Sequence, residues 1–415
     1  MTESTERRSV VVIGGGPAGL TTAAELAAQG VHDVVVLERE SQAGGIPRHS
    51  DHTGYGIRDL KRIMSGPKYA RLLVERARES GAEIRTGAMV TGWAGERTFD
   101  VTSPRGRQRV TADAVVLATG ARERPRPARL IPGDRPDGVY TTGQLQNMVH
   151  LEHQRVGDRA VIIGAELVSW SAVLTLRHAK CRTVAMTSVY EKPEAYAAFS
   201  WPGRLGLRVP VATNSRVVRI NGRGRVESVT IEDTRTGERR VIACDTVITS
   251  GDWIPDHELA RAARLELDPA TRGPEVDTAL RTSETGVFAA GNLLHAVDTA
   301  DIAALDGKHV ARTVRTYLDG AGEVGTGVRL VADAPLRWVA PQIVRADDAA
   351  PARNRLLLWA DAFKNVPTVT ATQAGRTVGT SRLAWPMAPG RVFRVPYSLL
   401  DGIDPSGPPV HLGVR

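Results

Sequence analysis

The sequence predicts an α/β protein with two nucleotide-binding βαβ units and a small C-terminal β domain. A strand, turn, helix and strand pattern occupies residues 9–38, and a second copy begins near residue 159. After about residue 326 the chain shows short alternating stretches and many prolines instead, which is typical of small β domains. A chain of 415 residues, 42% of them hydrophobic, has room for roughly two or three domains with cores of their own.

The first unit has the order and length of a nucleotide-binding motif. Residues 9–13 are an apolar strand, the apolar residues of 20–27 recur on one helix face, and residues 34–37 are a second apolar strand. Nucleotide-binding βαβ units span about 30 residues. The spacing therefore predicts a strand, a helix and a parallel second strand.

The turn of this unit carries a G-x-G-x-x-G fingerprint. Gly14 permits a tight turn, Gly16 lets the backbone approach a diphosphate, and Gly19 allows the helix to pack closely on the strand. The helix N-terminus then favours the negative charge of the diphosphate. Glu38 ends the second strand, where it can accept hydrogen bonds from an adenosine ribose. We expect a Rossmann-like dinucleotide site; a glycine turn with a purely structural role is the alternative.

The second unit repeats the pattern with an altered turn. Residues 159–163 predict a strand, residues 165 to about 178 a helix, and residues 183–186 another strand. Glu166 and Ser169 stand where the second and third glycines of a fingerprint would be. Two like charges about 4 Å apart near a surface repel by about 4 kcal/mol, so a carboxylate here disfavours a diphosphate.

The strand after this turn also lacks the expected partner for a nicotinamide dinucleotide. It ends at Ser188 and offers neither a carboxylate for an NAD ribose nor an adjacent arginine for an NADP phosphate. We therefore expect the second unit to have lost NAD(P)H binding. The alternative is that the loop has moved and binds NAD(P)H in another way.

Cysteine content and charge exclude several kinds of function. Cys181 and Cys244 are the only cysteines. They are too few for a disulfide framework and far from any C-x-x-C spacing, so we expect neither an iron-sulfur cluster nor a redox-active dithiol. The net charge of +8 comes mostly from scattered arginines, so we expect no nucleic-acid partner. A local cluster, interpreted as a solvated surface or as a docking site for an acidic partner, comprises Arg122, Arg124, Arg126, Arg129 and Arg135.

No segment suggests a membrane or secretory destination. The chain has no run of about 18 apolar residues, and its N-terminal residues lead directly into a short strand rather than a signal sequence. We therefore expect a cytoplasmic protein without a membrane span.

Three separated stretches resemble the two-dinucleotide-domain flavoproteins related to glutathione reductase. They are GGGPAGL at residues 14–20, VVLATG at 115–120 and TGVFAAGN at 285–292. The resemblance implies that FAD spans all three, with its ADP half on the first two. That family usually carries aspartate where this chain has Asn292, which still offers a carbonyl acceptor for a ribitol hydroxyl but without the added strength of a charge.

Further segments resemble the flavoprotein subunits of heteromeric dehydrogenases. Residues 44–70, beginning GGIPRH, look like the loop and helix that follow the acidic strand in subunits accompanying amine or glycerol-phosphate-type dehydrogenases. Residues 120–125 and 131–136 resemble the α-type subunits of opine oxidase, dye-linked proline dehydrogenase, sarcosine oxidase and hydrogen cyanide synthase. This resemblance covers about residues 9–320 and implies that the partner is a second flavoprotein or an electron-transfer subunit.

The predicted organisation follows from the fingerprint and the resemblance. An FAD-binding domain contains an inserted NAD(P)-like domain with a degraded fingerprint, and a small C-terminal β domain follows. The predicted boundaries are 1–125 and 251–325 for the two FAD-binding segments, 126–250 for the NAD(P)-like domain and 326–415 for the β domain.

The candidate site residues come from the same stretches, and no metal ligand is among them. The residues expected to bind FAD are Gly14, Gly16, Pro17, Ala18, Gly19, Glu38, Arg39, Gly45, Arg48, Val90, Ala118, Thr119, Gly120, Gly291, Asn292, Asp301 and Ile302. His49 and His52 are the candidate catalytic residues, because their loop should pass near the flavin ring and a histidine of pKa about 6.5 suits proton exchange. A structural or merely exposed role for both is the alternative.

The leading functional hypothesis is an FAD-dependent subunit of a dehydrogenase or oxidase. Its substrate would be a small amine, amino acid or polyol, and its electrons would pass through flavin N5 to a partner other than a nicotinamide. The alternatives are a non-catalytic FAD-binding subunit that couples a complex, and an NAD(P)H-dependent ferredoxin or quinone reductase.

Overall fold

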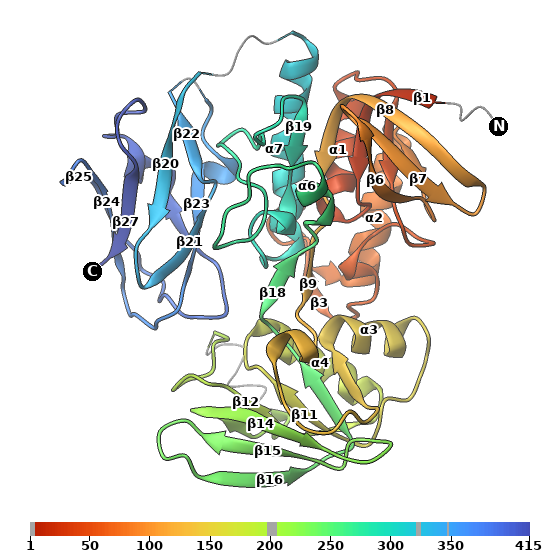
Figure 1. Cartoon of the computed structure of the whole chain (residues 1–415), viewed down its shortest axis with the longest axis vertical. Coiled ribbons are helices and arrows are strands. Elements are labelled where there is room, and N and C mark those ends of the chain that lie inside the picture. Colours follow the sequence, from red (N-terminus) through yellow and green to blue (C-terminus); the bar gives the residue numbers. More distant parts are fainter. Residues whose placement is uncertain (1–4, 197–205, 321–324, 347) are drawn as a thin grey trace.

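The computed structural model describes residues 5–196, 206–320, 325–346 and 348–415 in three packed regions (Figure 1). The first four residues, part of the stretch predicted to lack a signal sequence, lie outside the described ranges. None of the described helices combines the length and apolar character needed to cross a bilayer.

The first region is built on a largely parallel sheet in which β8 takes two partners on one side. The carboxyl end of β8 pairs with β19, its amino end pairs with β7, and β1 lies along its other side. The strand order is β5-β2-β1-β8-β7-β6. The strands are β1 (Thr5–Ile13), β2 (Val34–Leu37), β5 (Glu83–Arg85), β6 (Met89–Gly95), β7 (Thr98–Ser103), β8 (Gly106–Leu117) and β19 (Val287–Ala289).

Helices α1 (Pro17–Ala28) and α7 (Ala300–Leu318) pack side by side against this sheet (Figure 1). Their backbones approach closely because the contact is made by small residues: a Cβ on Gly307 would lie 2.3 Å from the carbonyl oxygen of Ala18. Val10, Val11 and Val12 of β1 are fully buried, as expected of a parallel strand covered on both faces. Helix α2 (Gly66–Glu79) also contacts α1.

The second region contains another parallel sheet and an antiparallel meander, at the bottom of Figure 1. The parallel sheet has the order β10-β17-β11-β12-β13, and the meander is β14-β15-β16. The elements are β10 (Val139–Thr141), α3 (Thr142–His150), β11 (Arg159–Ile163), α4 (Leu167–His178), β12 (Arg182–Thr187), β13 (Val211–Ala212), β14 (Ser215–Asn221), β15 (Ser228–Asp233), β16 (Arg239–Ala243) and β17 (Thr246–Thr249).

A two-stranded ribbon connects the two regions. Strand β9 (Ala121–Glu123) enters the second region, β18 (Trp253–Pro255) leaves it, and the two are antiparallel. The arginine cluster noted in the sequence begins in this ribbon, and two of its members contact the returning strand or the residues flanking it. Arg122 pairs with Asp256 and Glu258, and Arg129 donates to the carbonyl oxygen of Ser250 at 2.9 Å. These arginines stabilise the ribbon because carboxylates and carbonyls of the returning segment lie beside them.

The third region consists of two sheets packed around one core. The sheets have the orders β22-β20-β27-β24-β25 and β21-β23-β26, and Val328, Leu356, Val369 and Val395 meet in the core between them. The strands are β20 (Gly327–Ala332), β21 (Leu336–Ala340), β22 (Ile343–Arg345), β23 (Arg355–Ala360), β24 (Thr368–Gln373), β25 (Arg376–Arg382), β26 (Phe393–Pro396) and β27 (Val410–Val414).

Several predicted elements are confirmed, and others differ at their ends: β12, predicted at residues 183–186, runs from Arg182 to Thr187. Strands β2 and β11 have the predicted limits. Strand β1 begins at Thr5 because its polar first residues pair with β8, an interaction that periodicity does not reveal. Helix α4 begins at Leu167 because Glu166 is extended and forms its N-cap. The α/β class with a C-terminal β domain is confirmed; the exact domain boundaries stay a prediction.

Candidate functional site

The fingerprint turn is held by two close backbone approaches. A Cβ on Gly14 would lie 2.4 Å from the carbonyl oxygen of Ala118, and one on Gly19 would lie 1.9 Å from that of Gly14. Gly14 also has φ +111°, a conformation that favours glycine. A Cβ on Gly16, by contrast, would meet nothing within 4 Å. The turn is therefore tightly packed on the protein side and open at Gly16.

The first turn of α1 faces this open side. Gly16 is its N-cap and Pro17 its first residue, and it receives no side-chain cap from the described residues. The Gly44–Gly45 loop lies over the turn: Gly44 N–H donates to Gly15 O at 2.7 Å, and a Cβ on Gly45 would lie 2.9 Å from Gly16 Cα. Backbone N–H groups at such a helix end favour an anion. This geometry fits a diphosphate.

Glu38 lies at the carboxyl end of β2, beside the turn. Its carboxylate is buried and accepts hydrogen bonds from the N–H groups of Gly15 and Glu40, both at 2.8 Å. Its carbonyl accepts from Ala88 N–H at 2.9 Å, which places the start of β6, with the buried Val90, next to the same corner. Each carboxylate oxygen retains a further lone pair, so Glu38 fits the ribose role predicted for it.

The end of β8 supplies the next part of the site. Ala118 N–H donates to Ile13 O at 2.9 Å, continuing the pairing with β1. Thr119 donates its hydroxyl to Asp256 O at 2.7 Å, and Gly120 O accepts from Asp256 N–H at 2.9 Å. Arg39 reaches the Asp256 carboxylate at 3.3 Å from an exposed position. Residues far apart in the chain thus surround one end of the sheet.

The opposite end of the candidate site is built by residues after β19. Gly291, with φ +76°, lies so close to α1 that a Cβ would be 2.8 Å from that of Ala18. The Asn292 side chain accepts from Asp298 N–H at 3.0 Å and donates to Asp298 O at 3.1 Å. Asn292 therefore closes the loop before α7, and the second lone pair of its Oδ1 and the second N–H of its Nδ2 are left for a ribitol hydroxyl.

The N-terminus of α7 carries the last two candidates, Asp301 and Ile302, both buried. Asp301 accepts from Arg58 N–H at 2.9 Å and pairs with the Arg58 guanidinium at 3.3 Å. Tyr55 lies close to this group: burial raises the pKa of Tyr55 to about 12, the Ser50 hydroxyl opposes the rise and Asp301 adds to it. The tyrosine is thus un-ionised at neutral pH.

The two candidate catalytic histidines have different surroundings. His49 is 6% exposed; burial lowers its pKa to about 4, and Arg48 and His150 add to this. The assumption of an ordinary pKa is therefore wrong for His49, which is neutral at physiological pH. His52 Nε2 lies 3.0 Å from the Ser50 hydroxyl, and His52 Nδ1 lies 2.9 Å from Thr53 O.

Arg48, a predicted FAD-binding residue, pairs with Glu40 and donates to Gln42 O at 3.2 Å, so it stabilises its own loop.

The second fingerprint turn is filled by its own side chains. Glu166 is 5% exposed and accepts hydrogen bonds from the hydroxyls of Ser169 and Ser250, the latter at 2.5 Å. A Cβ on Gly164 would lie 2.9 Å from Glu166 Oε2. The carboxylate therefore lies inside the turn, bound to two serine hydroxyls.

A segment of the C-terminal β domain lies against this second turn. A Cβ on Gly390 would be 3.1 Å from the Cβ of Glu166 and 2.8 Å from that of Glu194. The guanidinium of the next residue, Arg391, stacks over the ring of Tyr196 at 3.7 Å. The second turn is thus covered by residues more than two hundred positions further along the chain.

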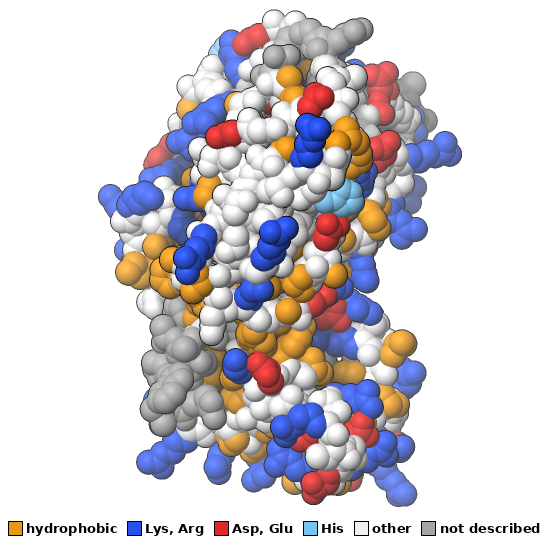
Figure 2. All heavy atoms as spheres, turned by 90° about the vertical axis from the view of Figure 1, so that its left-hand side faces the viewer, with side chains coloured by type: hydrophobic (Ala, Val, Ile, Leu, Met, Phe, Trp, Pro, Cys, Tyr) orange, Lys and Arg blue, Asp and Glu red, His pale blue; other side chains and the backbone are white. Residues whose placement is uncertain are grey.

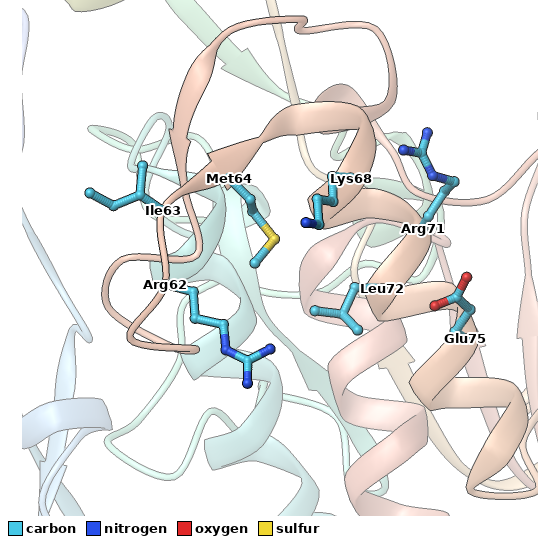
Figure 3. Close-up of a pocket in the computed structure, with 7 residues that line it drawn as sticks. All are labelled: Arg62, Ile63, Met64, Lys68, Arg71, Leu72 and Glu75. Atoms are coloured by element: carbon cyan, nitrogen blue, oxygen red, sulfur yellow. The ribbon is translucent and has the colours of Figure 1, made fainter.

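An open pocket of about 610 Å³ lies elsewhere in the first region, between α2 and the loop before it (Figure 3). No candidate cofactor or catalytic residue lines it. Its lining residues are Arg62, Ile63, Met64, Lys68, Arg71, Leu72 and Glu75. The pocket is therefore separate from the fingerprint site.

A family model described as pyridine nucleotide-disulphide oxidoreductase matches residues 8–307. The chain belongs to this family. Its members and relatives use FAD, and this chain is an FAD-dependent oxidoreductase. The open face at Gly16, the uncapped α1 and Glu38 fit the ADP half of that cofactor.

The named relatives of this chain differ in activity. The chain is 27% identical to thioredoxin reductase from Treponema pallidum, covering 75% of this chain and 97% of the relative. It is 29% identical to the ferredoxin–NAD(+) reductase subunit of a benzene 1,2-dioxygenase system from Pseudomonas putida, covering 68% and 66%. It is 28% identical to an opine oxidase subunit from Rhizobium meliloti, covering 68% and 58%.

A solved structure confirms the fold. Thioredoxin reductase from T. acidophilum matches with a TM-score of 0.63 at 23% identity, covering 75% of this chain and 99% of that one. A persulfide reductase from A. fulgidus matches with a TM-score of 0.57 at 19% identity and covers 90% of this chain and 70% of that one. These likenesses concern the fold alone.

Sequence reasoning did not single out some residues that the structure brings to the site. Glu123 and Gln146 lie buried between the first two regions, and Asp298 holds Asn292. No local pattern marks them, because each is placed by a contact with a distant segment.

Proposed function

We propose that this chain is the flavoprotein subunit of a heteromeric dehydrogenase or oxidase for a small amine, amino acid or polyol. Its electrons would leave for a partner other than NAD(P)H, either a second flavoprotein or an electron-transfer subunit. When bound, FAD supplies a ring that accepts a hydride equivalent at N5. We propose a cytoplasmic location, which suits two cysteines that are both free.

The residues that would hold FAD lie along one edge of the first sheet. The open turn at Gly16 would take the diphosphate, Glu38 the adenosine ribose, and the N-terminal end of α7 the flavin ring, where helix N–H groups favour partial negative charge. The full proposed set is Gly14, Gly16, Pro17, Ala18, Gly19, Glu38, Arg39, Gly45, Arg48, Val90, Ala118, Thr119, Gly120, Gly291, Asn292, Asp301 and Ile302.

The filled second turn is the observation on which the electron-partner proposal rests. A dinucleotide would have to displace the Glu166 carboxylate from two serine hydroxyls and move the backbone at Gly390. Neither change is offset by a new contact, because the turn has lost the glycines that would let a diphosphate approach. The opine oxidase relative is itself named as one subunit of its enzyme.

The cysteines argue against the reaction of the thioredoxin reductase relatives. Burial raises the pKa of Cys181 to about 12 and that of Cys244 to about 11, so both remain thiols at neutral pH. The thiolate is the reactive form. We therefore propose that this chain does not reduce disulfides.

An anaerobic reduction experiment tests the proposal. The flavin-loaded protein is mixed with NADH or NADPH and the flavin absorbance band is followed, with photochemical reduction as a control that the flavin can be reduced. We expect bleaching by light and none by either nucleotide within minutes. Rapid bleaching by a nicotinamide would contradict the proposal.

The second candidate function is an NAD(P)H-dependent ferredoxin or quinone reductase, favoured by the sequence relation to a ferredoxin–NAD(+) reductase subunit. This function requires the second turn to tolerate Glu166. The Glu166→Gly variant separates the two functions. If a nucleotide already binds beside Glu166, its measured affinity should hardly change. If the carboxylate blocks the turn, the variant should gain nucleotide affinity, and the gain should increase when Arg391→Ala loosens the covering segment.

A further inference from the structure

One face of α3 carries buried polar groups at the seam between the first two regions. Thr142 and Gln146 are four residues apart and therefore lie on the same face. Gln146 donates from Nε2 to the Ser171 hydroxyl at 2.6 Å and to the Ser50 hydroxyl at 3.3 Å. Glu123 of β9 accepts from Gly143 N–H at 2.9 Å. The face thus joins α4, the loop after Gly45 and the crossover ribbon.

Three atoms along this face are buried and have no hydrogen-bond partner among the described residues. They are Glu123 Oε1, Thr142 Oγ1 and His49 Nδ1, and their side chains are 6%, 1% and 6% exposed. The Thr142 hydroxyl lies close enough to the Glu123 carboxyl to lower its pKa, although neither Thr142 Oγ1 nor Glu123 Oε1 has a hydrogen-bond partner among the described residues. A buried polar atom without a partner costs about 1–3 kcal/mol. Such a group needs an explanation, and a missing ligand is one.

The charges around Glu123 favour a cation. Burial raises its pKa to about 7; the Gly143 N–H and the Thr142 hydroxyl oppose the rise, Glu166 adds to it and Arg129 opposes it. Arg129 is already engaged, because it donates to Arg124 O at 2.7 Å and to Ser250 O at 2.9 Å. No described cation forms an ion pair with Glu123, so its ionised form lacks a direct counter-charge.

We propose that this face of α3 binds a small protonated amine, with Glu123 Oε1 and Thr142 Oγ1 accepting hydrogen bonds from its ammonium group. The inference rests on the proposed function and selects the amine among the substrates named there. Glu123 and Thr142 bind the charged end, and the rest of the molecule extends along α3 toward Gln146 and His49, about one helical turn or ~5 Å away. The neutral His49 suits this place because it adds no competing positive charge.

A simpler role for Glu123 is to cap α3, since its second oxygen accepts from Gly143 N–H. Glutamine would keep this cap through its carbonyl oxygen but remove the charge. The Glu123→Gln variant therefore separates a cap from an ammonium site. Thr142→Val removes the second acceptor while keeping the size of the side chain.

Calorimetric titration of the oxidised, flavin-loaded protein provides the test. The probes are propylamine and pyrrolidine at pH 7, with propanol as an uncharged probe, in two buffers of different ionisation enthalpy. We expect both amines to bind, propanol not to bind, and about half a proton to be released per amine, because a carboxyl of pKa about 7 is half protonated at pH 7. Glu123→Gln should lose at least about 10-fold in affinity and all proton release, and Thr142→Val should bind more weakly.

The matched control is Glu194→Gln. Burial and then Glu166 raise the pKa of Glu194 to about 8, and its Oε2 also lacks a partner among the described residues, but it faces Gly390 rather than α3. It should bind amines like the unaltered protein. Amine binding that survives Glu123→Gln, or is absent from the unaltered protein, overturns the inference. Reduction by NADH would instead overturn the proposed function, so the two failures are distinct.

Discussion

At the scale of single residues, the glycines of one fingerprint are required for different reasons. Gly14 and Gly19 are fixed by contacts with backbone oxygens, so any side chain there disturbs the fold. Gly16 has φ −85°, and a Cβ on it would meet nothing within 4 Å, so the protein itself does not require a glycine. Only a ligand close to that Cα would make a side chain at Gly16 unfavourable.

The Gly16→Ala variant should therefore fold normally and bind FAD more weakly. We expect an unchanged melting temperature without flavin and a loss of about 10-fold or more in FAD affinity, corresponding to about 1.4 kcal/mol. Fluorescence titration with FAD and thermal unfolding of the flavin-free protein measure the two effects. Gly92→Ala is the control, because Gly92 lies outside the fingerprint, has no neighbour within 4 Å of the added Cβ and does not have a positive φ. Equal affinities of Gly16→Ala and unaltered protein would count against a diphosphate at Gly16.

At the scale of elements, the sequence is a good guide where a pattern is local. The βαβ unit of residues 9–38 could be predicted because strand, turn and helix are neighbours in the chain. The position of α3 against the loop after Gly45 could not, because Gln146 and Ser50 are joined only by the packing of two regions. Periodicity likewise does not show that Glu123 of a three-residue strand is buried against a helix N-terminus.

Burial of Glu123 should make stability depend on pH. Its pKa is about 7 when folded and 4.5 for an ordinary glutamate, so the folded state favours the protonated form. The contribution is complete below pH 4.5 and is lost as pH rises through 7. Between pH 5 and 8, the free energy of unfolding of the unaltered protein should fall relative to Glu123→Gln by up to about 3 kcal/mol.

Urea unfolding in amine-free buffer at a series of pH values measures this difference. Glu96→Gln, a substitution at a glutamate whose side chain is 70% exposed, is the control. A difference that stays constant over this pH range for Glu123→Gln would contradict the prediction.

At the scale of the whole molecule, the C-terminal β domain is fastened to both other regions. Arg345 pairs with Asp277 at 3.0 Å and Arg394 with Asp298 at 2.6 Å, while Gly390 lies against the second turn. Figure 2 shows Lys and Arg side chains spread over the face of the molecule that includes this domain, with Asp and Glu among them. The surplus positive charge is thus distributed there rather than gathered in one patch.

Arg394→Ala should weaken FAD binding although Arg394 is not among the predicted FAD-binding residues. The Asp298 side chain is only 5% exposed, and removing one partner of a buried ion pair costs about 3–5 kcal/mol. Since Asp298 also holds Asn292, we expect faster FAD loss together with the lower stability. Urea unfolding and flavin retention on dilution measure both effects.

Arg337→Ala is the control for this experiment. Its bridge to Asp361 is 3.8 Å long and half exposed on both sides, so the change should cost about 1 kcal/mol or less and leave flavin retention unchanged. Equal effects of the two substitutions would show that the Arg394 bridge has no special role.

The dinucleotide fingerprint, the duplication of the unit and the loss of glycines from the second copy could all be predicted from the order of the residues. These features are local, because a turn and the ends of its strand and helix are set by residues within one short segment. The tertiary structure alone decided that Glu166 turns inward, that the segment around Gly390 covers it, and that Glu123 meets α3. Those contacts join residues far apart in the chain, and only the packing of whole regions brings them within reach.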